Sequence, residues 1–286
     1  MKQIGTKLQD FTGKTARGFP TYQKGFRGRS TCQEKGAQSK KQLKTIRSRA
    51  NCLSTEEKAT NNILVKKASH RPKTMHIQMF TVGFFATNCY VVGCKETREA
   101  VVIDPGFDEA SETEKVLNYI ERNYRELKLI INTHGHSDHT CGNGLLRNKL
   151  NAGIAIHQND AHLLGDLGKQ IGQILGIHNF SPLPDIYLRN GDTIEFGKES
   201  LKVIETPGHT RGGICLIGKE EIFTGDTLFM GSIGRTDFPE SSQEEMKKSL
   251  RKLKTLQDSL TVYPGHGPST KLGDEKICNP FLTELL

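Results

Sequence analysis

Residues 131–140 of the chain read Ile131-Asn-Thr-His-Gly-His-Ser-Asp-His-Thr140. The stretch continues the apolar run Leu127-Lys-Leu-Ile-Ile-Asn-Thr133, which predicts a buried strand that ends at Thr133. The polar residues therefore lie on a loop at the C-terminal end of that strand. This loop holds three histidines and one aspartate within six residues, namely His134, His136, Asp138 and His139.

The spacing within the loop favours two metal sites. Gly135 lets the backbone bend, so that His134 and His136 face one ion. Asp138 and His139 follow at once and must face elsewhere, because one ion cannot take four ligands from six neighbouring residues without strain. Imidazole and carboxylate ligands together suit zinc, iron or manganese. The alternative is a surface loop that is rich in histidine by chance.

Three further residues argue against that alternative, because each stands at the end of a predicted strand. His209 follows Leu201-Lys-Val-Ile-Glu-Thr-Pro-Gly208, and His266 follows Leu260-Thr-Val-Tyr-Pro-Gly265. Both share the order strand, Pro-Gly turn, histidine. Asp226 follows the apolar run Glu221-Ile-Phe-Thr-Gly225. The histidines outside these motifs are expected to be structural or solvated: His70, His76, His157, His162 and His178.

Together these motifs resemble those of the metallo-β-lactamase-fold hydrolases and, within them, the glyoxalase II-like group. The resemblance covers residues 75–286. It implies a four-layer αββα sandwich, of class α/β, with the metal ions at one edge between the sheets. It also implies the ligand sets, which are His134, His136 and His209 for the first ion, Asp138, His139 and His266 for the second, and Asp226 as a bridge between both.

The order of strand-like and helix-like segments agrees with mixed sheets covered by helices. Helices are predicted at Glu109–Arg122, Thr140–Leu150 and Gln243–Leu256. Strands are predicted at His76–Val82, Cys89–Gly93, Ala100–Ile103, Leu127–Thr133, Gly153–Ile156, Leu201–Glu205, Gly213–Ile217, Glu221–Thr224 and Leu260–Tyr263.

Charge divides the chain into two unlike pieces. Residues 1–75 carry 18 Lys and Arg against 4 Asp and Glu, a net charge of +14, whereas residues 76–286 carry 22 against 28, a net charge of −6. The first piece has few apolar residues and no periodicity, so it is predicted to be disordered. We therefore expect a basic extension over residues 1–74 and a catalytic domain over residues 75–286.

Three roles are open for the extension: an organellar transit peptide, a nucleic-acid-binding arm, or an extension without function, which we favour. Neither a secretory signal nor a membrane span is expected, because the chain has no apolar run of the required length. The seven cysteines form no CxxC pair, which is typical of a reducing compartment. The expected location is the cytoplasm, or an organelle if the extension is a transit peptide.

The ligand set predicts an enzyme that acts on a small-molecule substrate. Two divalent ions, zinc first and iron or manganese as substitutes, would hold a bridging hydroxide that attacks an acyl carbon. Asp138 and Asp226 are the expected catalytic residues. An S-acyl thioester such as S-lactoylglutathione suits this centre, because a thiolate leaves without a general acid and none is evident.

Differences between this sequence and other members of the family reduce the range of expected substrates. β-Lactamases have a cysteine at the position of Asp226, which argues against antibiotic hydrolysis. Only 20 residues follow His266, so we do not expect the helical domain with which glyoxalase II enzymes bind glutathione. Pro268 also replaces a family tyrosine. Arg235 is retained and is the candidate for binding a substrate carboxylate, with an ion pair to Asp237 as the alternative.

Two other functions remain. Persulfide dioxygenases share a sequence like Gly234-Arg-Thr-Asp-Phe238 and use one iron, held by the equivalents of His134, His209 and Asp226. Two histidines and a carboxylate form the ligand set of non-haem iron oxygenases. The third reading is a nucleic-acid-binding module with structural metals. Structural zinc sites are usually rich in cysteine, so the ligand set argues against that reading.

Overall fold

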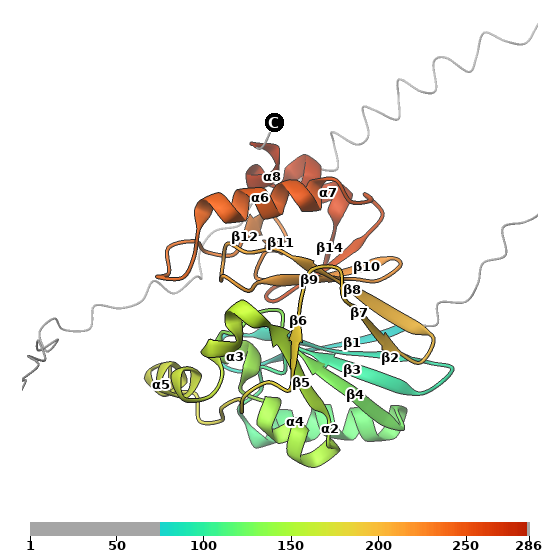
Figure 1. Cartoon of the computed structure of the whole chain (residues 1–286). Helices are drawn as coiled ribbons and strands as arrows, with labels where there is room; N and C mark the ends of the chain where they lie inside the picture. The colour runs from blue at the N-terminus through green and yellow to red at the C-terminus, as the bar shows by residue number, and fades with distance from the viewer. Residues whose placement is uncertain (1–74, 285–286) are drawn as a thin grey trace, which may run out of the picture. The chain divides into compact units, whose positions relative to one another are not determined.

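The computed structural model describes residues 75–284, which form two stacked six-stranded sheets with helices on both outer faces (Figure 1). This is the predicted four-layer sandwich. The first sheet has the strand order β1-β2-β3-β4-β5-β6. Its strands are β1 (Met75–Val82), β2 (Thr87–Cys94), β3 (Glu99–Ile103), β4 (Glu126–Ile131), β5 (Gly153–His157) and β6 (Ile186–Leu188). The predicted basic extension, residues 1–74, lies outside the described residues.

The second sheet has the order β14-β13-β10-β9-β8-β7. Its strands are β7 (Thr193–Phe196), β8 (Glu199–Glu205), β9 (Ile214–Ile217), β10 (Glu221–Gly225), β13 (Thr261–Pro264) and β14 (Thr270–Lys271). A small hairpin of β11 (Leu228–Phe229) and β12 (Ser232–Ile233) follows β10. Because β8 and β13 both run parallel to β10, the carboxyl ends of all three strands meet at one edge.

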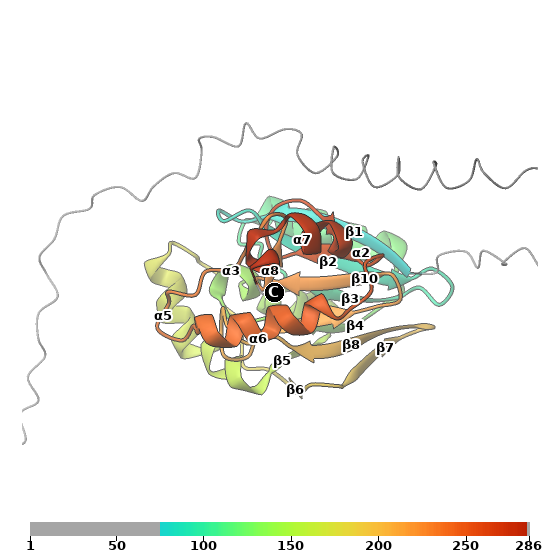
Figure 2. The same ribbon diagram turned by 90° about the horizontal axis from the view of Figure 1, so that it is seen from above.

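Helices cover the outer faces of both sheets. α2 (Ala110–Asn123) and α4 (Asn143–Leu150) lie on the first sheet. α6 (Gln243–Lys254), α7 (Leu272–Cys278) and α8 (Pro280–Thr283) lie on the second, as the view from above shows (Figure 2). Between β4 and β6 the chain also forms α3 (Ser137–Thr140), the 3₁₀ helix η1 (Gln158–Leu163) and α5 (Asp166–Ile174).

Three apolar clusters correspond to the three interfaces between the four layers. Along β2, Val91 packs outward with α2 residues such as Val116, whereas Tyr90 and Val92 pack inward against the second sheet. Successive residues of a strand point to opposite faces, so a strand buried on both faces must be apolar throughout. This explains why the buried strands were predicted from apolar runs. Fully burying each large side chain contributes about 1.5–3 kcal/mol.

The structure corrects the sequence prediction in two respects. The helix predicted at Thr140–Leu150 is two helices, α3 and α4, which are separated at Cys141 and Gly142. A Cβ on Gly142 would lie 2.5 Å from the carbonyl oxygen of Pro105, so the chain passes too close to its neighbour for a larger residue. The short strands β6, β7, β11, β12 and β14 and the helices α5, α7 and α8 were not predicted.

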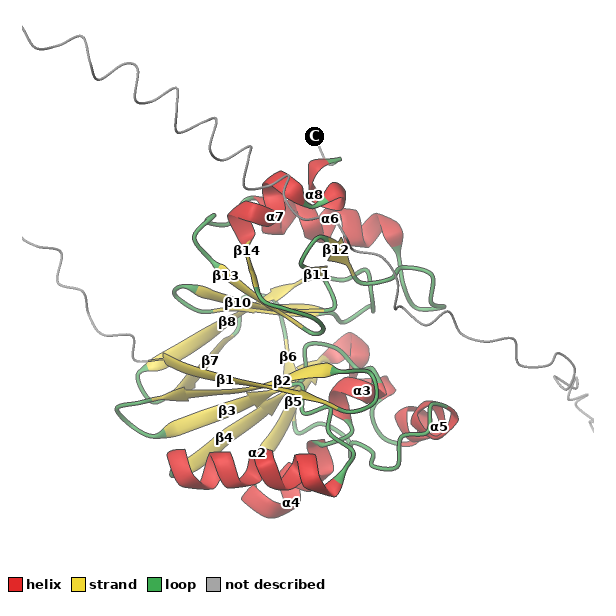
Figure 3. Cartoon of the chain, turned by 180° about the vertical axis from the view of Figure 1, so that it is seen from behind, coloured by secondary structure: helices red, strands yellow, loops and turns green. Residues whose placement is uncertain are grey.

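None of the helices between residues 75 and 284 has the length and apolar character that crossing a bilayer requires. The predicted site residues lie at the end of the sandwich where α3 is found, beside α5 (Figure 3). There the loop that follows β4 of the first sheet meets the loops that follow β8, β10 and β13 of the second.

Candidate metal centre

Three of the predicted ligands converge at this edge. His134 and His136 come from the loop after β4, and His209 comes from the loop after β8. The Nδ1 atom of His136 lies 3.1 Å from Nε2 of His134 and 2.9 Å from Nε2 of His209. Each imidazole thus turns one nitrogen to the same point, as a shared ion requires. We call these residues the first ligand group.

A second ligand group lies beside the first and consists of Asp138, His139 and His266. The Nε2 atoms of His139 and His266 are 3.1 Å apart. The Oδ2 atom of Asp138 lies 3.5 Å from each of those two nitrogens. The structure therefore divides the residues as the sequence predicted, although their role in holding metal stays a prediction.

Asp226 lies between the two ligand groups. Its Oδ2 atom is 3.4 Å from Nε2 of His209 and 3.6 Å from Nε2 of His266, and its Oδ1 atom is 3.5 Å from Nε2 of His139. Oδ1 is buried and has no hydrogen-bond partner within the described residues. An unpartnered buried carboxylate oxygen is costly, and a cation in contact with it would remove the cost. The donor set thus fits a divalent ion.

The outward nitrogens of the histidines fix which ring nitrogen faces the centre. Nδ1–H of His209 donates to the carbonyl oxygen of Arg235 (2.9 Å), and Nδ1–H of His266 donates to that of Phe85 (3.1 Å). In its neutral form, each ring therefore presents the lone pair of Nε2 inward. Metal-binding histidines commonly make such an outer hydrogen bond, because it sets the tautomer and the ring orientation.

Asp104 does the same for His139 and was missed by the sequence analysis. Its Oδ2 atom accepts from Nδ1–H of His139 (3.1 Å) and from the hydroxyl of Thr133 (2.6 Å), and its Oδ1 atom accepts from the backbone N–H of Thr133 (2.7 Å). Because both of its oxygens accept hydrogen bonds, Asp104 orients the predicted ligand His139 and is not itself well placed to bind an ion, although it lies close to the histidines. The sequence feature that could have identified Asp104 is its position directly after the predicted strand Ala100–Ile103.

His266 is held from the first sheet. The buried side chain of Asn88, on β2, donates to the carbonyl oxygens of Pro264 (3.0 Å) and Gly267 (2.7 Å), on both sides of the histidine. The hydroxyl of Tyr90 donates to the same Pro264 oxygen at 2.6 Å. The last predicted ligand is thereby fixed relative to both sheets.

The two ligand groups differ in charge. Burial and the neighbouring histidines lower the pKa of His134 well below its ordinary value, and burial with His209 lowers that of His136 to about 4. Burial opposes protonation of His139 as well, but Asp138, Asp226 and Asp104 outweigh it and raise its pKa to about 10. His134 and His136 thus favour the neutral imidazole, whereas His139 favours an imidazolium beside carboxylates.

Arg235 lies at the rim of the centre with its guanidinium paired to Asp237. Its Nε and Nη2 atoms donate to the two carboxylate oxygens at 2.6 and 2.7 Å. The guanidinium also lies 4.1 Å from the ring centre of Phe238, which itself contacts His136. The ion pair is the alternative that the sequence left open. Both side chains are more than half exposed, at 58% and 67%, so the pair is accessible to a substrate.

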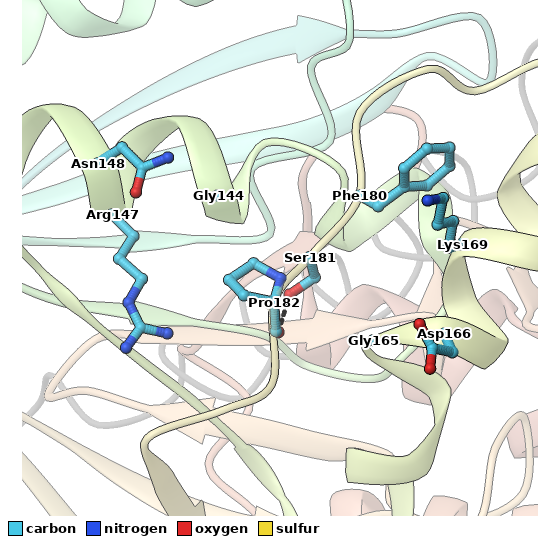
Figure 4. Close-up of a pocket in the computed structure, with 9 residues that line it drawn as sticks. All are labelled: Gly144, Arg147, Asn148, Gly165, Asp166, Lys169, Phe180, Ser181 and Pro182. Carbon is cyan, nitrogen blue, oxygen red and sulfur yellow. Dashed lines mark hydrogen bonds between the residues drawn. The ribbon is translucent and has the colours of Figure 1, made fainter.

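A separate pocket of about 460 Å³ contains none of the predicted site residues (Figure 4). It lies between α4 and α5. Arg147, which points into this region, is already paired with Asp185 at 2.7 Å, and Lys169 lies over the ring of Phe180. The pocket is lined by Gly144, Arg147, Asn148, Gly165, Asp166, Lys169, Phe180, Ser181 and Pro182.

Comparison with protein families gives a match to the model described as the metallo-beta-lactamase superfamily over residues 82–266. That range contains all the predicted ligands. Among curated proteins, the chain is 36% identical over 216 residues to the hydroxyacylglutathione hydrolase GloC of Haemophilus influenzae, covering 73% of this chain and 98% of GloC. It is 32% identical over 204 residues to the mitochondrial persulfide dioxygenase ETHE1 of Bos taurus, covering 69% and 72% of the two chains.

Among solved structures, the fold matches the crystal structure of TTHA1623 in a di-iron-bound form. The TM-score is 0.64 and the sequence identity is 33%, over 72% of this chain and 100% of the other.

Proposed function

Because the chain belongs to the metallo-beta-lactamase superfamily, we propose that it is a binuclear metal-dependent hydrolase of small S-acyl thioesters. One observation carries this proposal: two ligand groups adjoin, and the carboxylate of Asp226 reaches nitrogens of both. A single-ion centre has no need of the second group. The expected ions are zinc, with iron or manganese as substitutes.

Two bound divalent ions would supply an activated water and an acceptor for the charge that develops on a carbonyl oxygen. The protein's part is to keep the ligands in place. His209 and His266 are oriented through their Nδ1–H groups, His139 through Asp104, and Asp138 through the hydroxyl of Thr87, which donates to its Oδ2 atom at 3.2 Å. Groups held in this way need little reorganisation during the reaction.

The choice of a thioester rests on the leaving group. A thiol with a pKa of about 8.5 leaves as a thiolate, so no side chain has to donate a proton to it. GloC, one of the relatives at 36% identity, is named a hydroxyacylglutathione hydrolase, which supports this substrate class. Arg235 is the proposed contact for a substrate carboxylate, which would compete with Asp237 for the guanidinium.

A persulfide dioxygenase is the second candidate, because ETHE1 is similar at 32% identity. This activity would use one iron and three of the same residues, His134, His209 and Asp226. The Nε2 atom of His209 and the Oδ2 atom of Asp226 lie 3.4 Å apart, which suits a shared ion as well. The two candidates therefore differ in ion number and co-substrate and not in the residues present.

One experiment separates them. The protein is stripped of metal, reloaded with zinc, manganese or iron, and assayed for thiol release from S-lactoylglutathione and for oxygen uptake with glutathione persulfide. We expect thiol release that rises with the second equivalent of metal. Oxygen uptake on the iron form, with thioester cleavage at background for every metal, would replace the hydrolase with the dioxygenase.

A further inference from the structure

A buried carboxylate joins the two loops that carry the first ligand group. Asp160 lies on η1, is fully buried and belongs to neither ligand group. Its Oδ2 atom accepts from the N–H of Gly135 (3.0 Å), and its Oδ1 atom accepts from the N–H of Gly212 (2.5 Å). Gly135 lies between His134 and His136, and Gly212 lies on the loop of His209.

Both glycines are needed for this approach. A Cβ on Gly212 would lie 2.6 Å from the nitrogen of Asp160, and one on Gly135 would lie 2.6 Å from Cβ of Leu163, on the same 3₁₀ helix. The backbone of each loop therefore rests directly against η1. A backbone hydrogen bond also joins the two segments without Asp160, because the N–H of Ile214 donates to the carbonyl oxygen of Thr133 at 2.9 Å.

Burial of the Asp160 carboxylate carries a desolvation cost. Burial raises the pKa of Asp160 above its ordinary value, and the backbone donors of Gly135 and Gly212 oppose that rise. An apolar residue would avoid the desolvation but would leave two backbone N–H groups buried without acceptors. An asparagine would satisfy one N–H with its oxygen and turn its NH₂ group to the other. Only a carboxylate of this length satisfies both loops at once.

We propose that Asp160 is a positioning residue that holds the loop of His134 and His136 against the loop of His209 before an ion is bound. Ion binding by the first ligand group should therefore depend on Asp160. Ion binding by the second group, which consists of Asp138, His139 and His266, should not. This inference rests on the proposed function only in that the first group must bind an ion.

The test compares Asp160→Asn with a matched control, Asp108→Asn. Asp108 also accepts from two backbone N–H groups, those of His178 (2.9 Å) and Asn179 (2.7 Å), but joins segments that hold no predicted ligand. Each full-length protein is stripped of metal and titrated with cobalt, and the affinity and visible spectrum of each bound ion are recorded. We expect about a tenfold to hundredfold loss of affinity for the first ion in Asp160→Asn, an altered spectrum, and no change for the second ion. The control should bind both ions as the wild type does.

A wild-type measurement covers the case in which Asp160→Asn does not fold. In chelated protein, the amides of Gly135 and Gly212 should exchange with deuterium as slowly as the amide of Asn132, which donates within the backbone to Ala155 at 2.9 Å. Free exchange of both glycine amides until metal is added would overturn the inference. Unchanged first-ion affinity in a folded Asp160→Asn would do so too. A wild-type protein that binds no cobalt contradicts the proposed function instead.

Discussion

The carboxylate of Asp104 accepts a hydrogen bond from Nδ1–H of His139 at 3.1 Å, and both side chains are almost wholly buried. The backbone of Asp104 adopts a left-handed conformation with φ of 51°, which places its carboxylate beneath the loop that follows β4. Asparagine tolerates this conformation, so Asp104→Asn changes the charge and the hydrogen bonding while it leaves the backbone in place.

We expect Asp104→Asn to weaken binding of the second ion by about 10–100-fold, because a partner that orients a ligand typically contributes that much. The affinity for the first ion should change much less. Stepwise metal titration against a coloured chelator measures both. Asp258→Asn, which removes the ion pair between the exposed Asp258 side chain and Lys276 on α7, serves as the control. Equal losses at both sites would show that Asp104 supports the fold as a whole.

Asp226→Ala should remove both ions or most of the activity, since its carboxylate reaches both ligand groups. Asp138→Ala should weaken only the second ion, because its contacts are with His139 and His266. Elemental analysis of metal-replete protein gives the number of ions in each variant. Wild-type protein that saturates with a single ion under these conditions contradicts the binuclear centre.

The pKa values predict that the two ions differ in their dependence on pH. A metal ion binds the neutral imidazole, so a histidine whose pKa is raised to about 10 must lose its proton when the ion enters. The affinity for the second ion should therefore rise with pH, by about tenfold per unit for each proton released, until the pH passes that pKa. His134 and His136, whose pKa values are lowered, add no such dependence at neutral pH.

Titrations in weakly buffered solution, at several values between about pH 7 and 9, give the proton release for each equivalent of metal. His139→Gln should reduce the release that accompanies the second ion and leave that of the first unchanged. Identical pH slopes for the two ions would contradict the difference in charge between the ligand groups.

The ligands could be predicted from the sequence because each follows an apolar strand, and strand ends meet at one edge of a layered sheet. His209, Asp226 and His266 all have this arrangement. Asp104 and Asp160 were missed because their partners are distant in the chain: 35 residues separate Asp104 from His139. The position of Asp104 directly after a predicted strand is a local signal, but it does not identify His139 as the partner, and Asp160 on η1 has no such position.

Features of the local sequence explain why some helices and strands were not predicted. β7 has only four residues and α7 only seven, so each gives too short a pattern. α5 contains Gly168 and Gly172, which weaken a helical signal. Both glycines are explained only by packing, since a Cβ on Gly168 would lie 2.1 Å from the carbonyl oxygen of Leu163 and one on Gly172 would lie 3.0 Å from the ring of Phe180.

A truncated protein that begins at Met75 should fold and bind metal, because every predicted ligand and the three apolar clusters of the described residues are built from Met75 onward. Its kcat and its melting temperature should match those of the full chain. If residues 1–74 bind nucleic acid, the full chain alone should show an affinity that falls steeply with salt. Loss of folding on truncation would show that the proposed domain boundary is wrong.

Substitutions of Arg235 and of Asp237 should change KM in opposite directions. If a substrate carboxylate binds the guanidinium, Arg235→Ala removes a charge-assisted hydrogen bond and should raise KM by about tenfold. Asp237→Asn removes the competing carboxylate, which pairs with both Nε and Nη2, and should lower KM. Neither change should alter kcat greatly, because contacts made equally in the ground and transition states affect KM alone. Thiol release from S-lactoylglutathione and from a thioester with a carboxylate-free thiol checks this. Arg235 binds no carboxylate if both variants shift KM equally for the two substrates.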